Sequence, residues 1–336
     1  MRPILKFNLK CLLFTSLTLV CAFAKADPST NDLIRGFESQ SYMPTFRSCS
    51  LADGTTVTQI RSFQVKLSNN VVKNSALIVD GDSLETSVVS LAELFNCRET
   101  YAPHTLNNFQ GQNSDYLHAL AKLSSENIKS IKNAGSTHAI QPQRKLYLTV
   151  DLCPSHKALD VELFKKIQGG VKPVPVLIAI SGLWIMSHTN DLSKLQKMEA
   201  DGEIKITWAN HSYSHPYNPK SPLEHNFLLE AGVNFEQEVF KNEKLLLSHG
   251  IVPSVFFRFP GLVSVQEDIE LLRQWGLIPL GANAWLALGE KPSFGSFILV
   301  HGNGNEPKGL KLLYEEMTRN PDMKNEFSDI HEAFDQ

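Results

Sequence analysis

Two histidines four residues apart are the most distinctive chemical feature of this 336-residue sequence. His211 and His215 follow an alternating apolar run, Ile204, Ile206 and Trp208, which is typical of a buried strand. If the chain between the histidines forms one helical turn, both imidazoles lie on the same face and can bind one metal ion. Such a pair also occurs in surface turns, so it indicates a metal site only in combination with other residues.

From residue 145 onward the sequence alternates between short apolar runs and helical spacing of apolar residues, the pattern of parallel strands covered by helices. The expected strands are residues 145–150, 174–180, 204–209, 255–257, 277–280 and 297–300. The expected helices are residues 157–167, 192–200, 235–247, 266–275 and 310–317. So many strand–helix units in about 190 residues predict a small or incomplete (β/α) barrel rather than an open sheet.

Catalytic residues of parallel α/β barrels lie at the carboxyl ends of the strands. The polar or aromatic residues that follow the expected strands are Asp151, His211, His215, Arg258, Asn283, Trp285 and His301. A carboxylate, three imidazoles and a guanidinium at one edge of a sheet form an acid–base and metal-binding set. Because chance rarely places such a set at successive strand ends, the sequence predicts an active site there.

The order of these residues resembles the motifs of the polysaccharide deacetylase family, the NodB-homology domain of carbohydrate esterase family four. The resemblance covers roughly residues 145–320. The family motifs T-F-D-D-G-P-S, H-[ST]-x-x-H-P, R-x-P, a segment ending in Asp-Trp, and L-x-H are matched by TVDLCPS at 149–155, HSYSHP at 211–216, RFP at 258–260, NAW at 283–285 and LVH at 299–301. The resemblance implies an irregular (β/α) barrel of the NodB type, here at residues 141–336.

The resemblance also implies a reaction, which is hydrolysis of an N-acetyl or O-acetyl group on a polysaccharide or amino sugar with a divalent metal, zinc in the first place. His211 and His215 would bind the metal, which polarises the carbonyl and lowers the pKa of a water molecule. Asp151 would be the general base, held in place by Arg258, and His301 would be the general acid. The substrate-contacting set would be Trp285 and Leu299 around the acetyl methyl, the Gly261 backbone N–H at the oxyanion, and Asn283.

Two positions depart from the family pattern. Leu152 stands where the family has the aspartate that serves as third metal ligand, and a leucine side chain cannot coordinate a metal. Asp151 would then be the third ligand and lose its role as base, or Cys153, which replaces the family's glycine, would offer a thiolate. We expect Cys153 to be a buried structural thiol instead. Ala284 replaces the aspartate that tunes the general acid, and the neighbouring Asn283 supplies no charge.

These departures leave three interpretations open. The first is an active deacetylase with an altered metal site. The second is a carbohydrate-binding pseudoenzyme, for which Leu152 and Ala284 are the reason. The third is a hydrolase of a non-sugar amide, because a fold does not fix a function.

The first 26 residues have the pattern of a secretory signal peptide. Basic residues precede an apolar run at residues 12–23, and Ala24 and Ala26 place small residues at positions −3 and −1 of a cleavage site. The alternatives are a membrane anchor, for which the run is short, and a lipoprotein signal at Cys21, which lacks the small residues expected before it. We therefore expect a secreted or periplasmic mature protein.

The charge of the mature chain argues against several kinds of partner. Removing the signal peptide changes the net charge from −3 to −7, because that segment holds four basic residues and no acidic one. An acidic protein has no electrostatic reason to bind nucleic acid or anionic lipid. No later apolar run is long enough to span a bilayer, so we expect no membrane insertion after cleavage. The sequence carries no indication of an oligomeric state.

Residues 27–140 carry no recognisable site chemistry and are predicted to form a smaller mixed α+β accessory region. The expected strands are residues 57–67 and 75–79, the expected helices 90–95 and 116–133, and the expected loops 107–115 and 133–144. An exported protein favours a disulfide, and Cys49 and Cys97 are the expected pair because both lie in the N-terminal third. Cys153 would then be the remaining free thiol.

Overall fold

The computed structural model describes residues 37, 41–66, 70–99, 114–125, 132–141, 143–169 and 172–336. The predicted signal peptide and nearly all of the predicted loop at residues 107–115 lie outside the described residues. Within the described part, no helix combines the length and the apolar character needed to cross a membrane. The fold is mixed α/β, with one antiparallel and one parallel sheet.

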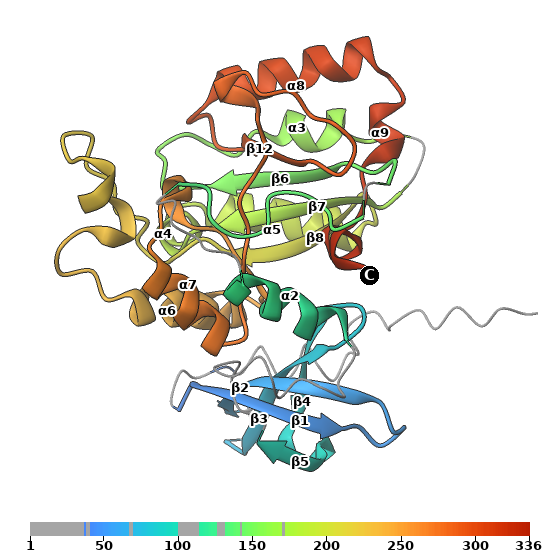
Figure 1. Ribbon diagram of the computed structural model, residues 1–336, viewed down its shortest axis with the longest axis vertical. Helices are drawn as coiled ribbons and strands as arrows, with labels where there is room; N and C mark the ends of the chain where they lie inside the picture. Colours follow the sequence, from blue (N-terminus) through green and yellow to red (C-terminus); the bar gives the residue numbers. More distant parts are fainter. Residues whose placement is uncertain are drawn as a thin grey trace, which may run out of the picture.

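An antiparallel five-stranded sheet occupies one end of the molecule (Figure 1). Its strands, in the spatial order β4-β3-β2-β1-β5, are β1 (Met43–Ser50), β2 (Thr56–Lys66), β3 (Val72–Asp80), β4 (Thr86–Ser90) and β5 (Phe95–Glu99). The predicted strands at 57–67 and 75–79 correspond to β2 and β3. The predicted helix at 90–95 is wrong: it begins with the 3-10 turn η1 (Leu91–Glu93) and then enters β5, because β5 pairs with β1.

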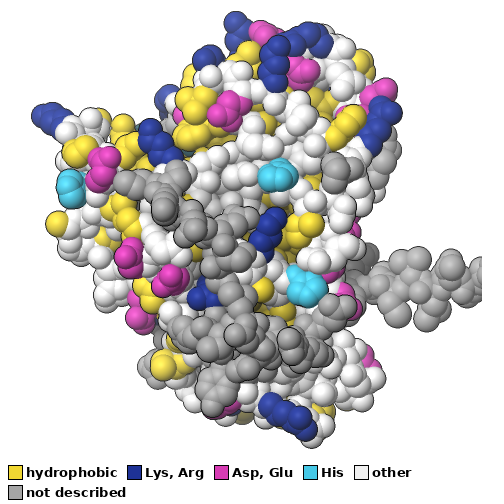
Figure 2. Space-filling model, in the orientation of Figure 1, with side chains coloured by type: hydrophobic (Ala, Val, Ile, Leu, Met, Phe, Trp, Pro, Cys, Tyr) yellow, Lys and Arg dark blue, Asp and Glu magenta, His cyan; other side chains and the backbone are white. Residues whose placement is uncertain are grey.

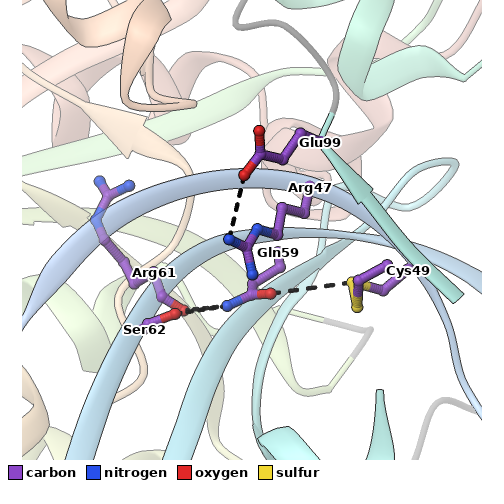
Figure 3. The surroundings of a disulfide bond; sticks show 7 residues. Arg47, Cys49, Gln59, Arg61, Ser62 and Glu99 are labelled. Carbon is purple, nitrogen blue, oxygen red and sulfur yellow. Dashed lines mark hydrogen bonds and ion pairs between the residues drawn. A yellow bond between two sulfur atoms is a disulfide. The ribbon is translucent and has the colours of Figure 1, made fainter. Parts of the chain in front are cut away.

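The predicted disulfide joins Cys49 of β1 to Cys97 of β5 (Figure 3). The two cysteines are 48 residues apart in the sequence. Closing a loop of this length lowers the conformational entropy of the unfolded chain, which stabilises the folded protein by about 4 kcal/mol. On the same strands Arg47 forms an exposed ion pair with Glu99 at 3.4 Å. Figure 3 also shows that the side chain of Arg61 on β2 points away from the disulfide.

Seven parallel strands form the second sheet, in the order β10-β9-β8-β7-β6-β12-β11. They are β6 (Tyr147–Leu152), β7 (Val174–Ile180), β8 (Ile204–Asn210), β9 (Phe256–Phe257), β10 (Ile278–Pro279), β11 (Ala284–Trp285) and β12 (Phe297–His301). All six predicted strands of this region are present, and the two-residue β11 is additional. The sheet is curled, but its two edge strands, β10 and β11, do not pair with each other, so the barrel is incomplete, as predicted.

Residues 132–140, which fall almost wholly in the predicted loop at 133–144, run between the edge strand β10 and the start of β12 near the other side of this open sheet. Ser136 bridges to Leu280 beside β10, and His138 bridges to Ser296 beside β12. Gly135 has a φ of 97°, and a Cβ there would collide with the Pro279 carbonyl, so only glycine allows this close approach. The segment therefore fills the gap that the short strands leave.

Helices pack on both faces of the parallel sheet, and α3 and α8 lie on the side away from α6 and α7 (Figure 1). The described helices are α2 (Asp115–Ser125), α3 (Val161–Lys166), α4 (Gly182–Ser187), α5 (Thr189–Ala200), α6 (Phe235–Ser248), α7 (Gln266–Gln274), α8 (Pro307–Arg319) and α9 (Met323–Glu326). The 3-10 turns are η3 (Leu223–His225), η4 (Phe227–Leu229), η5 (Pro260–Leu262), η6 (Leu286–Leu288) and η7 (Ile330–Phe334). The predicted helix at 116–133 is α2 in the described part, and the predicted helix at 157–167 is confirmed in the shorter form of α3.

Side chains along β6 alternate between two environments. Tyr147 joins the core cluster that includes residues of the antiparallel sheet, whereas Leu148, Val150 and Leu152 join a second cluster under α3, α5 and α8. This alternation follows from the period of two in a strand. Leu152 is fully buried in that second cluster, so it points away from the side that carries Asp151.

A buried ion pair joins the antiparallel sheet to the parallel half of the molecule. Arg61 of β2 donates from Nε and Nη2 to the two carboxylate oxygens of Glu243 on α6, at 2.8 and 2.9 Å. Their side chains are 0% and 1% exposed, and the Tyr42 hydroxyl donates to the same carboxylate at 2.6 Å. The region predicted to be accessory is thus packed tightly against the barrel.

Candidate active site

The carboxyl ends of the parallel strands bring most of the predicted site residues together. Asp151 in β6 and His301 at the end of β12 are register partners on neighbouring strands. His211 directly follows β8, and Arg258 directly follows β9. A cavity of about 870 Å³ opens here, and its lining includes Asp151, Cys153, His211, His215, Tyr217, Phe227, Gly261, Trp285, Leu299, His301 and Glu306.

The two paired histidines lie on a loop and not on a helix, so the expected helical turn is wrong. Ser212 and His215 have φ values of 63° and 44°, and these left-handed residues turn the chain back toward the cavity. The imidazoles still converge, with ring centroids 4.7 Å apart. Nδ1 of His211 donates to the Arg258 carbonyl at 2.7 Å, which leaves Nε2 directed at the site.

Helix α6 holds this loop from behind. The Asn242 side chain donates to Asn210 Oδ1 at 2.8 Å, and the same oxygen accepts the backbone N–H of Ser212 at 3.0 Å. Glu238 accepts both the backbone N–H and the hydroxyl of Ser214 at 2.7 Å. These contacts fix the loop between the two histidines. Side chains of α6 pair, directly or through Asn210, with the backbone N–H groups of the residues that follow β8.

Asp151 and Arg258 form a buried ion pair whose closest atoms are farther apart than in a hydrogen bond. The Arg258 Nη1 lies 3.6 Å from Asp151 Oδ1, while its Nη2 donates to Thr149 Oγ1 at 3.1 Å. Both side chains are at most 4% exposed, and burial lowers the pKa of Arg258 while the carboxylate opposes that shift. Asp151 Oδ1 has no hydrogen-bond partner among the described residues. The guanidinium therefore faces Oδ1 of the carboxylate, while the second oxygen, Oδ2, lies 3.8 Å from His211 Nε2.

His301 has a carboxylate partner that the motifs did not indicate. Its Nδ1 lies 2.9 Å from Glu306 Oε2, and Trp285 Nε1 donates to the same oxygen at 2.8 Å. Burial lowers the pKa of His301, but the thiol of Cys153 and the carboxylate of Glu306 together raise it well above its usual value. Glu306, on the loop that follows β12, thus places a carboxylate beside His301, where Ala284 offers none.

The predicted buried thiol, Cys153, is free and 7% exposed. Its Sγ lies 3.4 Å from His211 Nε2, and Cys153, His211 and His215 offer donor atoms that all lie within 4.8 Å of one another. Burial raises the pKa of the thiol, but the imidazoles of His215 and His301 outweigh this effect and lower it to about 6. One sulfur and two nitrogens at this spacing fit a zinc-sized ion.

The predicted substrate-contacting residues divide into two groups. Leu299 and Trp285 form an apolar wall with Leu262 and Ala282, and Gly261 has a φ of 60° where a Cβ would collide with the Phe227 ring. Asn283 is exposed and is not part of the cavity lining, because its Oδ1 accepts the backbone N–H of Phe297 at 3.1 Å.

An aromatic pair at the cavity was not anticipated from the sequence. Tyr217 stacks on Phe227 with ring centroids 5.2 Å apart, and Tyr217 is 62% exposed. Neither residue belongs to a motif, and both lie in the long segment between β8 and α6. A stacked, solvent-facing ring of this kind offers an apolar platform for a sugar ring.

Charges on the described surface are mixed. On the face shown in Figure 2, Lys and Arg side chains are interspersed with Asp and Glu rather than gathered into one basic patch.

Comparison with solved structures finds several proteins at low sequence identity. A family 4 carbohydrate esterase from Bacillus anthracis is 17% identical, over 62% of this chain and 87% of that chain, with a TM-score of 0.42. PdaA from Bacillus subtilis, a family 4 carbohydrate esterase, is 14% identical over 65% and 88%, also with a TM-score of 0.42. BA3943, a CE4 family pseudoenzyme from Bacillus anthracis, is 15% identical over 58% and 67%, with a TM-score of 0.40. No protein-family model matches the sequence.

Proposed function

We propose that the protein is a hydrolase that removes an N-acetyl or O-acetyl group from an amino sugar of a polysaccharide, with a carbon–nitrogen bond as the main target. The observation that carries this proposal is the placement of Asp151 and His301 at the same register of neighbouring strands. They provide a carboxylate and an imidazole in the cavity that also holds His211 and His215. The resemblance of the five motifs supports the same reaction.

The metal-binding set provides the first half of the chemistry. A divalent ion held by His211 and His215, when bound, supplies a Lewis acid that polarises the acetyl carbonyl and lowers the pKa of water. Asp151 accepts the proton of the water whose oxygen attacks the carbonyl carbon, and Arg258 keeps its carboxylate in position. The backbone N–H of Gly261 donates to the oxygen that gains negative charge.

His301 completes the reaction by protonating the leaving nitrogen. The carbon–nitrogen bond breaks as the imidazolium proton moves to the nitrogen, and the products are acetate and a free amine. Glu306 keeps His301 protonated before this step, since its carboxylate lies 2.9 Å from Nδ1 and raises the pKa of the imidazole. Trp285 and Leu299 enclose the acetyl methyl group in their apolar wall.

We assign residues 1–26 to a signal peptide, 27–140 to the N-terminal region and 141–336 to the deacetylase-like domain. The Cys49–Cys97 disulfide supports a secreted or periplasmic location, because such bonds form and persist in oxidising compartments.

The test is acetate release by residues 27–336 from N-acetylated chitooligosaccharides and peptidoglycan fragments, with zinc or cobalt added. We expect release by the wild type, loss in His301→Ala, and full activity in the control His138→Ala, an exposed histidine outside the cavity. Mass spectrometry of the products separates a sugar substrate from a non-sugar amide. Absence of release in all conditions, with saccharide binding intact, would favour the pseudoenzyme interpretation, for which the position of Leu152 is the specific reason.

A further inference from the structure

A catalytic zinc ion normally takes three protein ligands, and two imidazoles are one short. The family's third ligand position is Leu152, which is fully buried in the cluster under α3, α5 and α8. Two side chains of the cavity remain as candidates, the carboxylate of Asp151 and the thiol of Cys153.

The position of the thiol matches what one ion requires. With bonds of about 2.3 Å to sulfur and 2.0–2.1 Å to nitrogen, a tetrahedral site separates sulfur and nitrogen by about 3.5 Å. Cys153 Sγ lies 3.4 Å from His211 Nε2. Cys153 follows Leu152 along the strand direction and therefore returns to the side of Asp151.

Both imidazoles present the nitrogen that coordination needs. Because Nδ1 of His211 donates to the Arg258 carbonyl, its Nε2 carries a free lone pair, as in other metal sites oriented by a backbone carbonyl. Nε2 of His215 is buried and has no hydrogen-bond partner among the described residues.

The backbone beside the thiol is also held firmly. The buried side chain of Asn303 donates to the Cys153 carbonyl at 2.6 Å, and the Ser181 hydroxyl donates to the Leu152 carbonyl at 3.0 Å. The thiol therefore does not depend on a flexible loop for its direction.

Asp151 is the poorer ligand because its carboxylate lies farther from the histidine pair. Its Oδ2 lies 3.8 Å from His211 Nε2, whereas Cys153 Sγ lies 3.4 Å from the same nitrogen. Cys153, His211 and His215 offer donor atoms that all lie within 4.8 Å of one another, and Asp151 does not belong to this group, while its Oδ1 lies 3.6 Å from Arg258 Nη1.

We propose that Cys153, His211 and His215 form a cysteine–dihistidine zinc centre, in which the thiolate replaces the carboxylate ligand and Asp151 stays free to act as the base. Cys153 coordinates as the thiolate, so the ligand set carries one negative charge. A soft thiolate selects zinc, cobalt or cadmium over magnesium, calcium and manganese. This centre deepens the proposed function, yet its test needs no substrate.

The test is titration of the metal-free mature protein with cobalt, followed by absorption spectroscopy, and zinc affinity measured by chelator competition. We expect one ion per chain and a near-ultraviolet thiolate-to-cobalt charge-transfer band. Cys153→Ser should abolish the band and weaken zinc binding by at least about 100-fold, the upper end of what an outer-shell change costs. Cys153→Asp should lose the band and keep much of the affinity, since a carboxylate is also a zinc ligand.

The matched control is Asp151→Asn, which should keep the band and weaken zinc binding by no more than about 10-fold, the lower end of what an outer-shell change costs. A band that persists in Cys153→Ser, or that disappears in Asp151→Asn but not in Cys153→Ser, would overturn the proposal. So would a wild type that binds no cobalt.

A second measurement uses the wild type alone, in case a variant does not fold. Cys153 is the free thiol of the described chain, so its alkylation by iodoacetamide can be followed by peptide mass spectrometry. Zinc should slow this reaction and magnesium should not, and equal rates with and without zinc would contradict coordination by the thiol. A cobalt band without acetate release would leave this centre standing and reject only the proposed hydrolysis.

Discussion

Replacing Glu243 by glutamine is expected to destabilise the whole protein by about 3–5 kcal/mol, the usual result of breaking a buried ion pair. Arg61 and Glu243 are 0% and 1% exposed and share two hydrogen bonds of 2.8 and 2.9 Å. Glutamine has nearly the same shape, and its one amide oxygen can still accept from the Tyr42 hydroxyl and from Arg61 Nε, but its NH2 group cannot accept the second hydrogen bond from Arg61. The change therefore removes the charge and one hydrogen bond. Arg61 would remain buried beside a neutral group.

The matched control is Glu99→Gln, which breaks the exposed pair with Arg47 on the same sheet. These side chains are 83% and 43% exposed and lie 3.4 Å apart, so the loss should stay below about 1 kcal/mol. Together the two variants separate the effect of burial from the effect of removing one glutamate.

The assay is urea unfolding at pH 7 with the disulfide intact, followed by tryptophan fluorescence and analysed with a common slope. Hydrogen exchange of α6 provides a second readout, because Asn242 beside Glu243 holds the histidine loop. Faster exchange at residues 238–243 is expected in Glu243→Gln alone. A loss of stability no greater than that of Glu99→Gln would refute the reasoning. The ion pair between residues 27–140 and the parallel half would then contribute little to the free energy of unfolding.

Three further predictions concern the site and the pH dependence. Glu306→Gln should lower the pKa of His301, move the alkaline fall of kcat to lower pH and reduce kcat by about 10–100-fold, measured in a pH–rate profile of acetate release. Tyr217→Ala should raise KM by about 3–10-fold at unchanged zinc affinity, since a stacked ring contributes about 0.5–1.5 kcal/mol. Asp329 is buried, which raises the pKa of its carboxyl, but the pairs with His331 and Lys205 outweigh this and depress it, so its stabilisation is present above the unfolded-state pKa near 4 and is lost as the pH falls. Asp329→Asn should therefore cost about 2 kcal/mol at pH 7 and flatten the acid side of the stability profile in urea titrations.

The parallel sheet was predictable because its strands are almost wholly buried. The apolar run of β7, for example, is buried at nearly every position, and such runs are typical of parallel strands covered on both faces. The antiparallel sheet was harder to predict, because β1 and β5 are half-buried or exposed and rich in polar residues. Their pairing depends on contacts distant in sequence, which local patterns do not reveal.

Within the site, the sequence located the residues at strand ends but not the geometry between them. The four-residue spacing of His211 and His215 is equally compatible with a helical turn and with the observed loop, which needs two residues in left-handed conformations. Glu306 was missed because its relation to His301 arises from the path of the loop after β12. The direction of Cys153 likewise follows from where β6 ends, which the motif does not specify.

The two departures from the family pattern are compensated by the same physical device. A missing carboxylate ligand at Leu152 would leave the metal underneutralised, and the adjacent thiol supplies one negative charge 3.4 Å from His211. A missing carboxylate at Ala284 would leave His301 without a counter-ion, and Glu306 supplies that charge at 2.9 Å. In the proposed hydrolysis the two charges would serve the metal and the general acid, so Cys153→Ser and Glu306→Gln are expected to impair different halves of the same reaction.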